Sequence, residues 1–265
     1  MASVDQAGSA ERLKARQADY YDHAIGNREF EINRPHGESR LYQYAMEFKF
    51  KRLLDLLGHG LNGFTVLAVC CGSGMDAEFL ASAGADVVAL DISFGCLRRA
   101  DERRNRFGAR YELIQGDIEH LPFTDAAFDY SFVHDGLHHL ADHAPAIREM
   151  ARVARLGVLV SEPAKAAVTS IPTSLGLLSA REEAGNTVNR VEPSLATELL
   201  RESGFDRVRS SRFLLKYGHP PARWWRRLDG GAFPVGKLAV GIGASVLSPV
   251  GNKLVLVAER TAARK

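Results

Sequence analysis

The chain has 265 residues, of which 46% are hydrophobic and 25% are charged, and its formal net charge is +2. A chain of this length suits one α/β domain with additions, and its core is large enough to fold without disulfide or metal staples. A net charge this close to zero does not indicate a nucleic-acid partner. The three cysteines, Cys70, Cys71 and Cys96, are too few for a disulfide framework and favour a reducing compartment.

The N-terminal region is expected to be helical after a short polar start. Residues 1–10 are small and polar, so we expect them to be disordered. The N-terminal region lacks the apolar core of a secretion signal, so we expect a cytoplasmic protein. A helix is predicted over 11–25 and a second over 41–57, where apolar residues recur on one stripe. The loop at 34–37 separates them, and its Arg34 and His36 are candidates for holding a polar acceptor or are solvated loop residues.

The central region alternates predicted strands and helices, which is typical of a parallel sheet. The expected strands cover 65–69, 86–90, 111–114, 130–133 and 157–161, and the expected helices cover 75–83, 144–154 and 193–203. The last two strands are expected at 208–217 and 253–259. No apolar run is long enough to cross a bilayer.

The first strand leads into a turn of small residues, Cys71, Gly72, Ser73 and Gly74, before a helix begins. Residues without a Cβ atom let ligand atoms approach the backbone and allow unusual φ values. The second strand ends in Asp91, whose carboxylate can accept hydrogen bonds from two adjacent ribose hydroxyls. The pattern indicates a nucleotide-like ligand at this edge of the sheet.

These residues resemble the Rossmann-like (class I) S-adenosylmethionine-dependent methyltransferases, in particular the ubiquinone/menaquinone-type and natural-product small-molecule group. The usual first motif VLDVGCGTG reads VLAVCCGSG here, Asp91 stands in the ribose position, and Gly116-Asp117-Ile118 stands in the adenine position. The resemblance covers roughly 53–162. It departs at Ala68, where an acid usually supports the methionine end, and at Cys70, which replaces a glycine.

The resemblance implies a seven-stranded, mostly parallel sheet with a C-terminal antiparallel hairpin strand and a helical N-terminal lid. The implied domains are a lid at 1–58 and a cofactor-binding methyltransferase domain at 59–265, interrupted by insertions at 164–192 and 218–252. The implied cofactor is S-adenosylmethionine, and no resident metal is expected.

Several cofactor contacts follow from the same resemblance. Asp117 would accept from the adenine amino group, while Ile118 and Ile92 would pack on the two faces of the adenine ring. Tyr20 and Tyr21 would close over the methionine moiety, and His134 would contact the cofactor. The alternative for Asp91 and Asp117 is a role as helix-capping or turn acids.

The segment 128–140 resembles the FD-(strand)-LHH signature of small-molecule methyltransferases and carries His138 and His139. Histidine titrates near neutral pH and suits removal of a hydroxyl proton, so His138 first and His139 second are candidate bases. Glu162, at the end of the fifth strand, would orient the imidazole or act as the base itself. Alternatively the histidines only stabilise the local turn, and transfer proceeds by proximity without a base. Metal sites at the three cysteines, or at His138, His139 and His143, are weaker alternatives.

The insertion 218–252 contains two tryptophans flanked by arginines, followed by an apolar run. It is expected to be a satellite helix, a dimer surface, a cap over the acceptor pocket or a peripheral membrane contact. The predicted function is methylation of a small molecule, most directly O-methylation of a secondary metabolite, sugar or phenol/quinone. C- or N-methylation of a small molecule or lipid, a non-methylating cofactor-binding protein and an NAD-dependent enzyme are the alternatives. A nucleic-acid substrate is not expected, because the fourth strand lacks the aromatic clamp used on a flipped base.

Overall fold

The computed structural model describes residues 2–24, 27–165, 189–215, 217–246 and 251–261. Its centre is a seven-stranded sheet in the order β3-β2-β1-β4-β5-β7-β6. Neighbouring strands pair in parallel except at β7, which runs antiparallel to both β5 and β6. The predicted sheet is therefore confirmed. The strands are β1 Thr65–Val69, β2 Asp86–Asp91, β3 Glu112–Gln115, β4 Phe128–His134, β5 Ala154–Pro163, β6 Arg207–Phe213 and β7 Lys253–Glu259.

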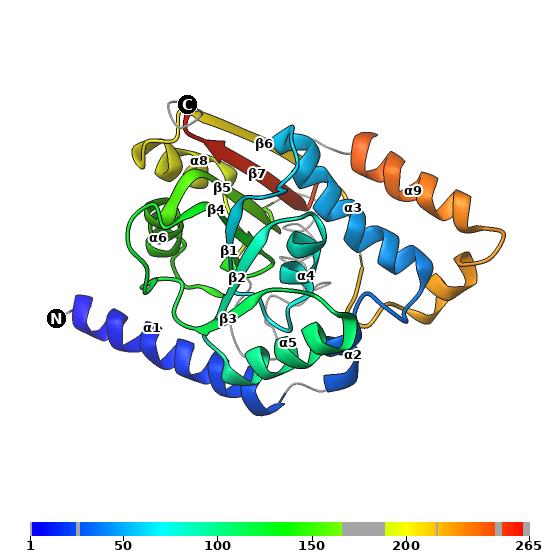
Figure 1. Ribbon diagram of the computed structural model, residues 1–265, viewed down its shortest axis with the longest axis horizontal. Coiled ribbons are helices and arrows are strands. Elements are labelled where there is room, and N and C mark those ends of the chain that lie inside the picture. The colour runs from blue at the N-terminus through cyan, green and yellow to red at the C-terminus, as the bar shows by residue number, and fades with distance from the viewer. Residues whose placement is uncertain (1, 25–26, 166–188, 216, 247–250, 262–265) are drawn as a thin grey trace.

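Helices cover both faces of this sheet, as expected for parallel strands joined by crossovers (Figure 1). Glycines in the left-handed conformation end α3 and α5, at Gly58 and Gly108. The helical elements are α1 Ala2–Asp19, η1 Tyr20–Ala24, α2 Arg28–Asn33, α3 Arg40–Leu57, α4 Met75–Ser82, α5 Phe94–Phe107, η2 Leu137–His139, α6 Ala144–Val153, α8 Pro193–Glu202, η3 Arg223–Leu228 and α9 Phe233–Val246.

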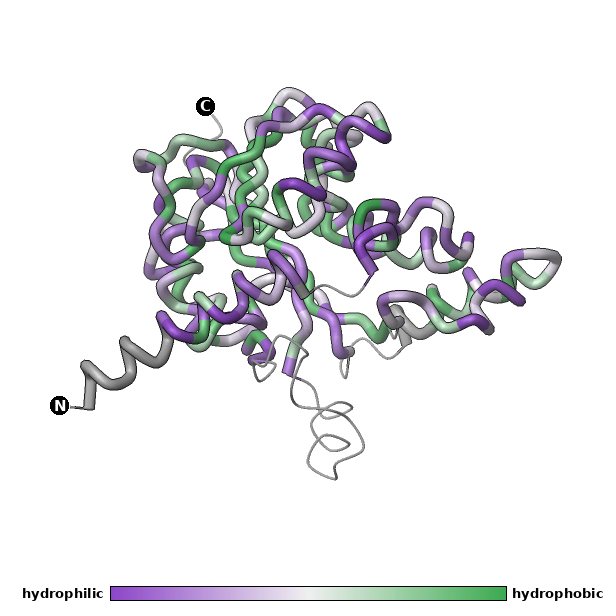
Figure 2. The backbone as a smooth tube through the Cα atoms, turned by 90° about the horizontal axis from the view of Figure 1, so that it is seen from below, coloured by the Kyte–Doolittle hydropathy of each residue, from purple (hydrophilic) through white to green (hydrophobic). Residues whose placement is uncertain are grey.

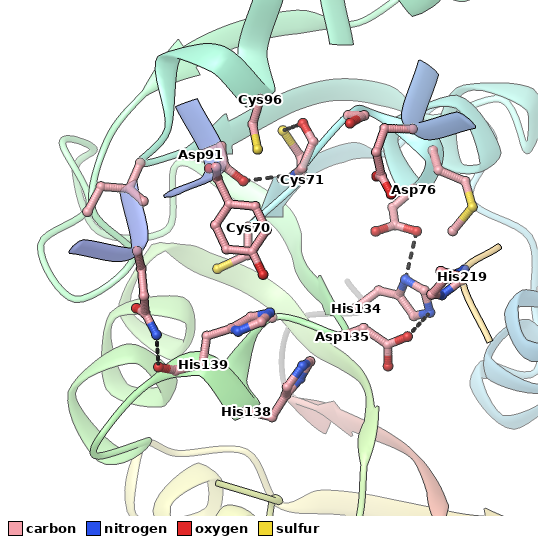
Figure 3. Close-up of a pocket in the computed structure, with 18 of the residues that line it drawn as sticks. Cys70, Cys71, Asp76, Asp91, Cys96, His134, Asp135, His138, His139 and His219 are labelled. Carbon is pink, nitrogen blue, oxygen red and sulfur yellow. Dashed lines mark hydrogen bonds and ion pairs between the residues drawn. The ribbon is translucent and has the colours of Figure 1, made fainter. Parts of the chain in front are cut away.

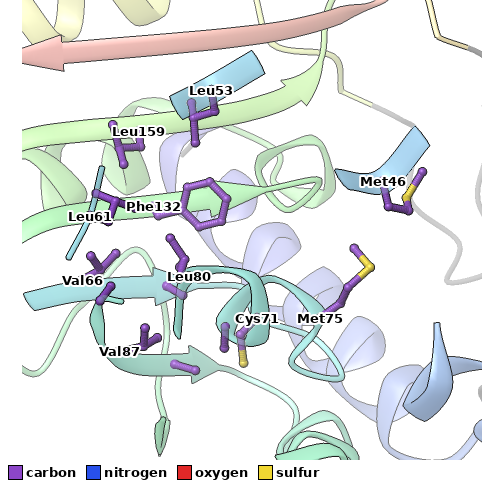
Figure 4. Close-up of a cluster of buried hydrophobic side chains, with 14 of the residues drawn as sticks. Met46, Leu53, Leu61, Val66, Cys71, Met75, Leu80, Val87, Phe132 and Leu159 are labelled. Atoms are coloured by element: carbon purple, nitrogen blue, oxygen red, sulfur yellow. The ribbon is translucent and has the colours of Figure 1, made fainter. Parts of the chain in front are cut away.

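Successive residues of each central strand point to opposite faces of the sheet and pack into two separate hydrophobic clusters. In β1, Val66 packs into the cluster under α3 and α4, whereas Leu67 packs into the cluster under α6 and α8. Figure 4 shows the first cluster, in which Phe132 of β4 and Leu53 of α3 face each other across the layer. Phe132 is 1% exposed, so its truncation to alanine is expected to cost about 3 to 5 kcal/mol.

The N-terminal helices differ in detail from the prediction. The first helix begins at Ala2, so the disorder expected for residues 1–10 is not seen at 2–10. It ends at Asp19 and continues as a π-helical turn, η1, which carries Tyr20 and Tyr21. In contrast to α1, α3 packs against β5 and β7 and contributes to the core. A domain boundary at residue 58 stays a prediction.

The insertion 218–252 forms the short helix η3 and the longer helix α9, which lies beside α3 at the end of the molecule away from α1 (Figure 1). Hydrophobic colour is most continuous on the central strands, whereas the outer helices alternate between hydrophilic and hydrophobic residues (Figure 2). Most of the other predicted insertion, 166–188, lies outside the described residues. Within the part of the chain that the structure describes, no helix is both long and apolar enough to cross a membrane.

Candidate active site

A cavity of about 730 Å³ lies beyond the carboxyl ends of β1, β2 and β4, within the range of small-molecule sites. Register explains its position: Val69 pairs with Leu90 on one side and Val133 on the other, so the three strand ends meet. Figure 3 shows side chains from all three strand ends pointing into it. The predicted site residues that line it are Tyr20, Tyr21, Cys71, Gly72, Ser73, Asp91, Ile92, Asp117, Ile118, His134, His138 and His139.

The turn after β1 uses its two glycines differently. Gly72 has a φ of +52°, and a Cβ atom built there would meet nothing within 4 Å, so ligand atoms can approach its backbone. Gly74 does not line the cavity; a Cβ there would lie 2.6 Å from the Tyr111 hydroxyl. In this structure Gly74 serves close packing against Tyr111 and Ala100 of α5, and its role as a direct cofactor contact stays a prediction.

Cys70 occupies the position where a glycine is usual, and its φ is +53°. A non-glycine residue in this conformation is strained and needs room for its side chain. Gly136 supplies that room, because a Cβ built on Gly136 would lie 2.5 Å from the Cβ of Cys70. The unusual cysteine in the first motif is thus matched by a glycine after β4.

The Asp91 carboxylate is held by backbone donors. Gly72 N donates to Oδ2 at 2.8 Å and Ser93 N donates to Oδ1 at 2.9 Å. Burial raises the pKa of Asp91, and these two backbone N–H groups oppose the rise. Each oxygen keeps a further lone pair, so the carboxylate is oriented and still able to accept from a diol.

The Asp117 end of the cavity is closed by α1. Lys14 Nζ donates to Asp117 Oδ2 at 2.8 Å and also pairs with Glu119. Burial lowers the pKa of Lys14, but the two carboxylates outweigh this effect and raise the pKa to about 12. Ile118 is buried and Ile92 is 36% exposed at the same end. Asp117 lies at the cavity, and its contact with an adenine amino group stays a prediction; the lysine that pairs with it gave no signal in the sequence.

The lid turn η1 is anchored to α5. Asp22 Oδ1 accepts from Ser93 Oγ at 2.5 Å and from Gly95 N at 2.8 Å. On α1, Gln17 Nε2 donates to the carbonyl oxygen of His139 at 2.9 Å. The Tyr21 ring meets the His139 ring edge-on, with centroids 5.7 Å apart. The expected lid therefore lies over the cavity, held by polar contacts that sequence reasoning missed.

His138 and Glu162 form a buried pair at the floor of the cavity. His138 Nδ1 lies 3.0 Å from Glu162 Oε2, while Oε1 accepts from Gly136 N at 2.6 Å and Leu137 N at 2.8 Å. Burial raises the pKa of Glu162, but His138 and the backbone N–H groups hold it below its ordinary value. An ionised carboxylate only accepts hydrogen bonds, so His138 Nδ1 is the donor.

Glu162 is 1% exposed and does not line the cavity. Of the two roles predicted for it, contact with the acceptor as a base does not fit this position, and orientation of the imidazole does. His139 packs on His138 with ring centroids 4.1 Å apart and lies on the Asp91 side. His143 is separate: its Nε2 lies 3.0 Å from the Asn189 carbonyl oxygen.

A buried ion network lies at the end of β4. His134 Nδ1 is 2.8 Å from Asp76 Oδ1, and His134 Nε2 is 3.4 Å from Asp135 Oδ2. Asp135 also accepts from Lys49 at 2.7 Å and from Lys253 at 3.3 Å. Burial raises the pKa of Asp135, but the two lysines hold it well below its ordinary value. His134 is thereby fixed between two carboxylates.

The end of the cavity opposite Asp91 is polar and comes from segments distant in sequence. Tyr217, His219 and Lys253 line it together with Arg34. Tyr42 Oη lies 2.5 Å from His219 Nδ1, and burial lowers the pKa of His219 well below its usual range, so the hydroxyl donates to a neutral ring. Arg34 pairs with Glu31 at 3.1 Å.

Arg34 Nε is buried with no hydrogen-bond partner among the residues that the structure describes. The other loop residue singled out from the sequence, His36, instead contacts Glu78 at 2.6 Å and does not line the cavity. Of the two predicted acceptor-binding residues, only Arg34 therefore reaches the site. In the described ranges, no three His, Cys, Asp or Glu side chains gather closely enough to hold a metal ion.

Comparison with known proteins adds three findings. Residues 67–161 match the family model of a methyltransferase domain. The chain is 37% identical over 97 residues to a demethylmenaquinone methyltransferase of Thermobifida fusca, covering 36% of this chain and 41% of that protein. It is 38% identical over 110 residues to the enzyme of the same name from Renibacterium salmoninarum, covering 41% and 44%. The match thus spans less than half the length of these relatives.

Among solved structures, the chain resembles magnesium protoporphyrin IX methyltransferase from Synechocystis with bound S-adenosylhomocysteine. The TM-score is 0.62 at 17% identity, covering 94% of this chain and 100% of that one. It also resembles the [4+2]-cyclase SpnF, with a TM-score of 0.52 at 18% identity, covering 83% and 82%. At these identities the likeness shows a shared fold.

Proposed function

We propose that this chain is a class I S-adenosylmethionine-dependent methyltransferase that transfers a methyl group to an oxygen atom of a small, hydroxyl-bearing acceptor. One observation carries the proposal. His138 lines the same cavity as Asp91, and its Nδ1 is hydrogen-bonded to the buried, ionised Glu162. This arrangement provides a base directed at an acceptor next to a cofactor site.

The residues present fit the cofactor. The Asp91 carboxylate has lone pairs left for a ribose diol, and Gly72 leaves its backbone open. Ile92 and Ile118 offer apolar surface for an adenine ring beside Asp117. S-adenosylmethionine supplies an electrophilic methyl group on a sulfonium, and the cavity's carboxylates favour such a cation.

The proposed role of His138 as a base depends on which of its two ring nitrogens carries the proton. Because Nδ1 donates to Glu162, the lone pair of the neutral imidazole is on Nε2. There it can take the proton from an acceptor hydroxyl as the oxygen attacks the methyl group, and Glu162 then stabilises the imidazolium. Glu162 is in this account a positioning residue. Tyr21 and Gln17, which hold the lid on His139, would keep water out of the cavity.

The polar end of the cavity is the proposed acceptor end. Lys253 and the buried Arg34 Nε offer donors to oxygen substituents of the acceptor, whereas the Tyr217 hydroxyl already donates to Asp135 at 3.0 Å. A phenol or quinol with oxygen atoms on both sides of its ring would place one at His138 and another at these donors. We therefore expect an oxygen-rich aromatic or sugar-like acceptor.

Carbon methylation of a quinol ring is the second candidate, because the curated relatives are named demethylmenaquinone methyltransferases. The same base would act, since removal of a phenolic proton also raises the electron density of the neighbouring ring carbon. The likeness to a cyclase keeps a non-methylating activity as the rival class.

Turnover of methyl-labelled cofactor with a panel of phenols, quinols and sugars tests the proposal. Label appearing in an O-methyl group, identified by NMR of the product, supports it, and label on a ring carbon supports the second candidate. Cofactor binding by calorimetry without turnover across the whole panel would favour the rival.

A further inference from the structure

The insertion between β6 and β7 carries an exposed apolar face with basic residues along it. We name it the η3–α9 face and define it by Trp224, Val235, Leu238 and Ile242, which are 55%, 65%, 62% and 51% exposed. Seven large hydrophobic side chains are exposed among the described residues, and these are four of them. A soluble helix normally buries such residues, so this face is suited to a partner.

The three apolar residues of α9 lie on one side of the helix, because their spacings of three and four residues bring them into line. The other side packs on the protein: Gly236 lies against Leu41 of α3, and Val240 packs on the core. The helix is therefore already anchored by one face, and its outward face is apolar. With 14 residues it reaches only about 21 Å, less than the ~30 Å hydrocarbon core of a bilayer.

The positive charge of η3 and α9 favours a partner with a negatively charged surface. The sequences of η3 and α9 contain three arginines, Arg223, Arg226 and Arg227, and no acidic residue. Lys237 lies over the Tyr44 ring on the α3 side, and Asp229, between the two helices, accepts from Ser39 of the protein body. The three arginines are exposed, although Arg226 reaches Glu38 at 3.4 Å. An apolar helix face bordered by tryptophan and basic residues is the pattern of a helix that lies in the interface of an anionic membrane.

The face is also connected to the active-site cavity. Trp224 packs on Trp225, and the buried Trp225 meets the Tyr42 ring at a centroid distance of 6.3 Å. Tyr42 in turn is hydrogen-bonded to His219, which lines the cavity. The same insertion thus forms part of the cavity wall and presents the apolar face.

We propose that the η3–α9 face docks on the surface of an anionic lipid bilayer, with α9 lying in the plane of the interface. Leu238, Val235, Ile242 and Trp224 enter the headgroup region, and the arginines pair with lipid phosphates. As a consequence that rests on the proposed function, the acceptor is a molecule that partitions into the membrane.

Flotation of the purified full chain with vesicles tests the docking without any acceptor. Vesicles of phosphatidylcholine mixed with phosphatidylglycerol should bind the chain, and pure phosphatidylcholine should bind it much less. Leu238→Glu should abolish binding, and Arg226→Gln with Arg227→Gln should weaken it roughly five-fold for each arginine. Leu195→Glu is the matched control, because Leu195 is 40% exposed on α8, away from this face, and should change nothing.

Absence of binding to the anionic vesicles, or an equal loss in Leu195→Glu, overturns the proposal. If the chain does not bind vesicles but is a dimer that Leu238→Glu dissociates, measured by light scattering, the face is an interface between two copies instead. Turnover of a water-soluble acceptor should be the same in Leu238→Glu as in the unmodified chain, whereas turnover of a vesicle-embedded acceptor should fall at least ten-fold. Failure of both turnovers in the unmodified chain would count against the proposed function and leave the vesicle result to decide docking alone.

Discussion

Replacement of Glu162 by glutamine isolates the proposed role of the buried carboxylate. Oε1 accepts the Gly136 and Leu137 N–H groups at 2.6 and 2.8 Å, and the glutamine carbonyl oxygen can take over both bonds. The amide NH₂ must then face His138 Nδ1, which lies 3.0 Å from Oε2. Two donors cannot pair, so the imidazole proton moves to Nε2 and the ring faces the cavity as a donor.

The expected loss follows from the removal of the base. General-base catalysis contributes about 10² to 10⁴-fold, so kcat should fall by that factor, or about 3 to 5.5 kcal/mol of activation free energy. Cofactor affinity should change little, because Asp91 and Gly72 are untouched. Steady-state kinetics with the acceptor found in the panel, together with calorimetry for S-adenosylhomocysteine, measures both quantities.

Two variants provide the controls. Glu149→Gln also alters a carboxylate that accepts a backbone N–H, from Leu121 at 2.8 Å, but Glu149 does not line the cavity, so kcat should stay within about two-fold. His138→Gln should lose as much activity as Glu162→Gln, and the double variant should lose no more. If Glu162→Gln keeps kcat within about three-fold, His138 is not the base and transfer proceeds by proximity.

The same substitution has a pH signature in stability. The folded pKa of Glu162 lies below its ordinary 4.5, so its contribution is fully present above pH 4.5 and is lost as the pH falls through the folded value. Below pH 4.5 the melting temperature of the Glu162→Gln variant should therefore fall less steeply than that of the unmodified chain. If the melting temperatures of the variant and of the unmodified chain fall in parallel with pH, the Glu162 carboxylate is not ionised in the folded protein.

Further predictions concern the cofactor end. Asp91→Asn should weaken cofactor binding by about 1.5 to 3 kcal/mol in calorimetry, because charge-assisted hydrogen bonds are lost; unchanged affinity would remove Asp91 from the site. Lys14→Gln should speed release of S-adenosylhomocysteine in stopped-flow measurements by freeing α1 from Asp117, whereas Arg12→Gln, exposed on the same helix, should not. Gly136→Ala should lower the free energy of unfolding by about 1 to 3 kcal/mol, because the new methyl group clashes with Cys70. Adding Cys70→Gly to the same chain should restore most of that stability. If the destabilisations of the two single variants simply add in the double variant, the packing of Cys70 against Gly136 is not the cause.

The sequence by itself determined the sheet and the position of the cavity. Apolar runs such as 65–69 are buried strands because each must exclude water on both faces, and a glycine turn after the first strand places a ligand site at its carboxyl end. Asp91 and His134 end their strands, and Asp117 and His138 come shortly after theirs, so local order along the chain was enough to bring all four to one edge.

Only the tertiary structure decided what these residues contact. Lys14, Lys49, Tyr217 and Lys253 lie more than 80 residues from their acidic partners, and a lone lysine on a helix carries no mark of the carboxylate it will meet. The sequence also does not distinguish Gly72 from Gly74. The space beside Gly72 is open to the cavity, whereas the space beside Gly74 is occupied by Tyr111. Pairings of this kind depend on how helices settle on the sheet, because charge and packing energies arise from distances in space, and periodicity in the chain does not encode them.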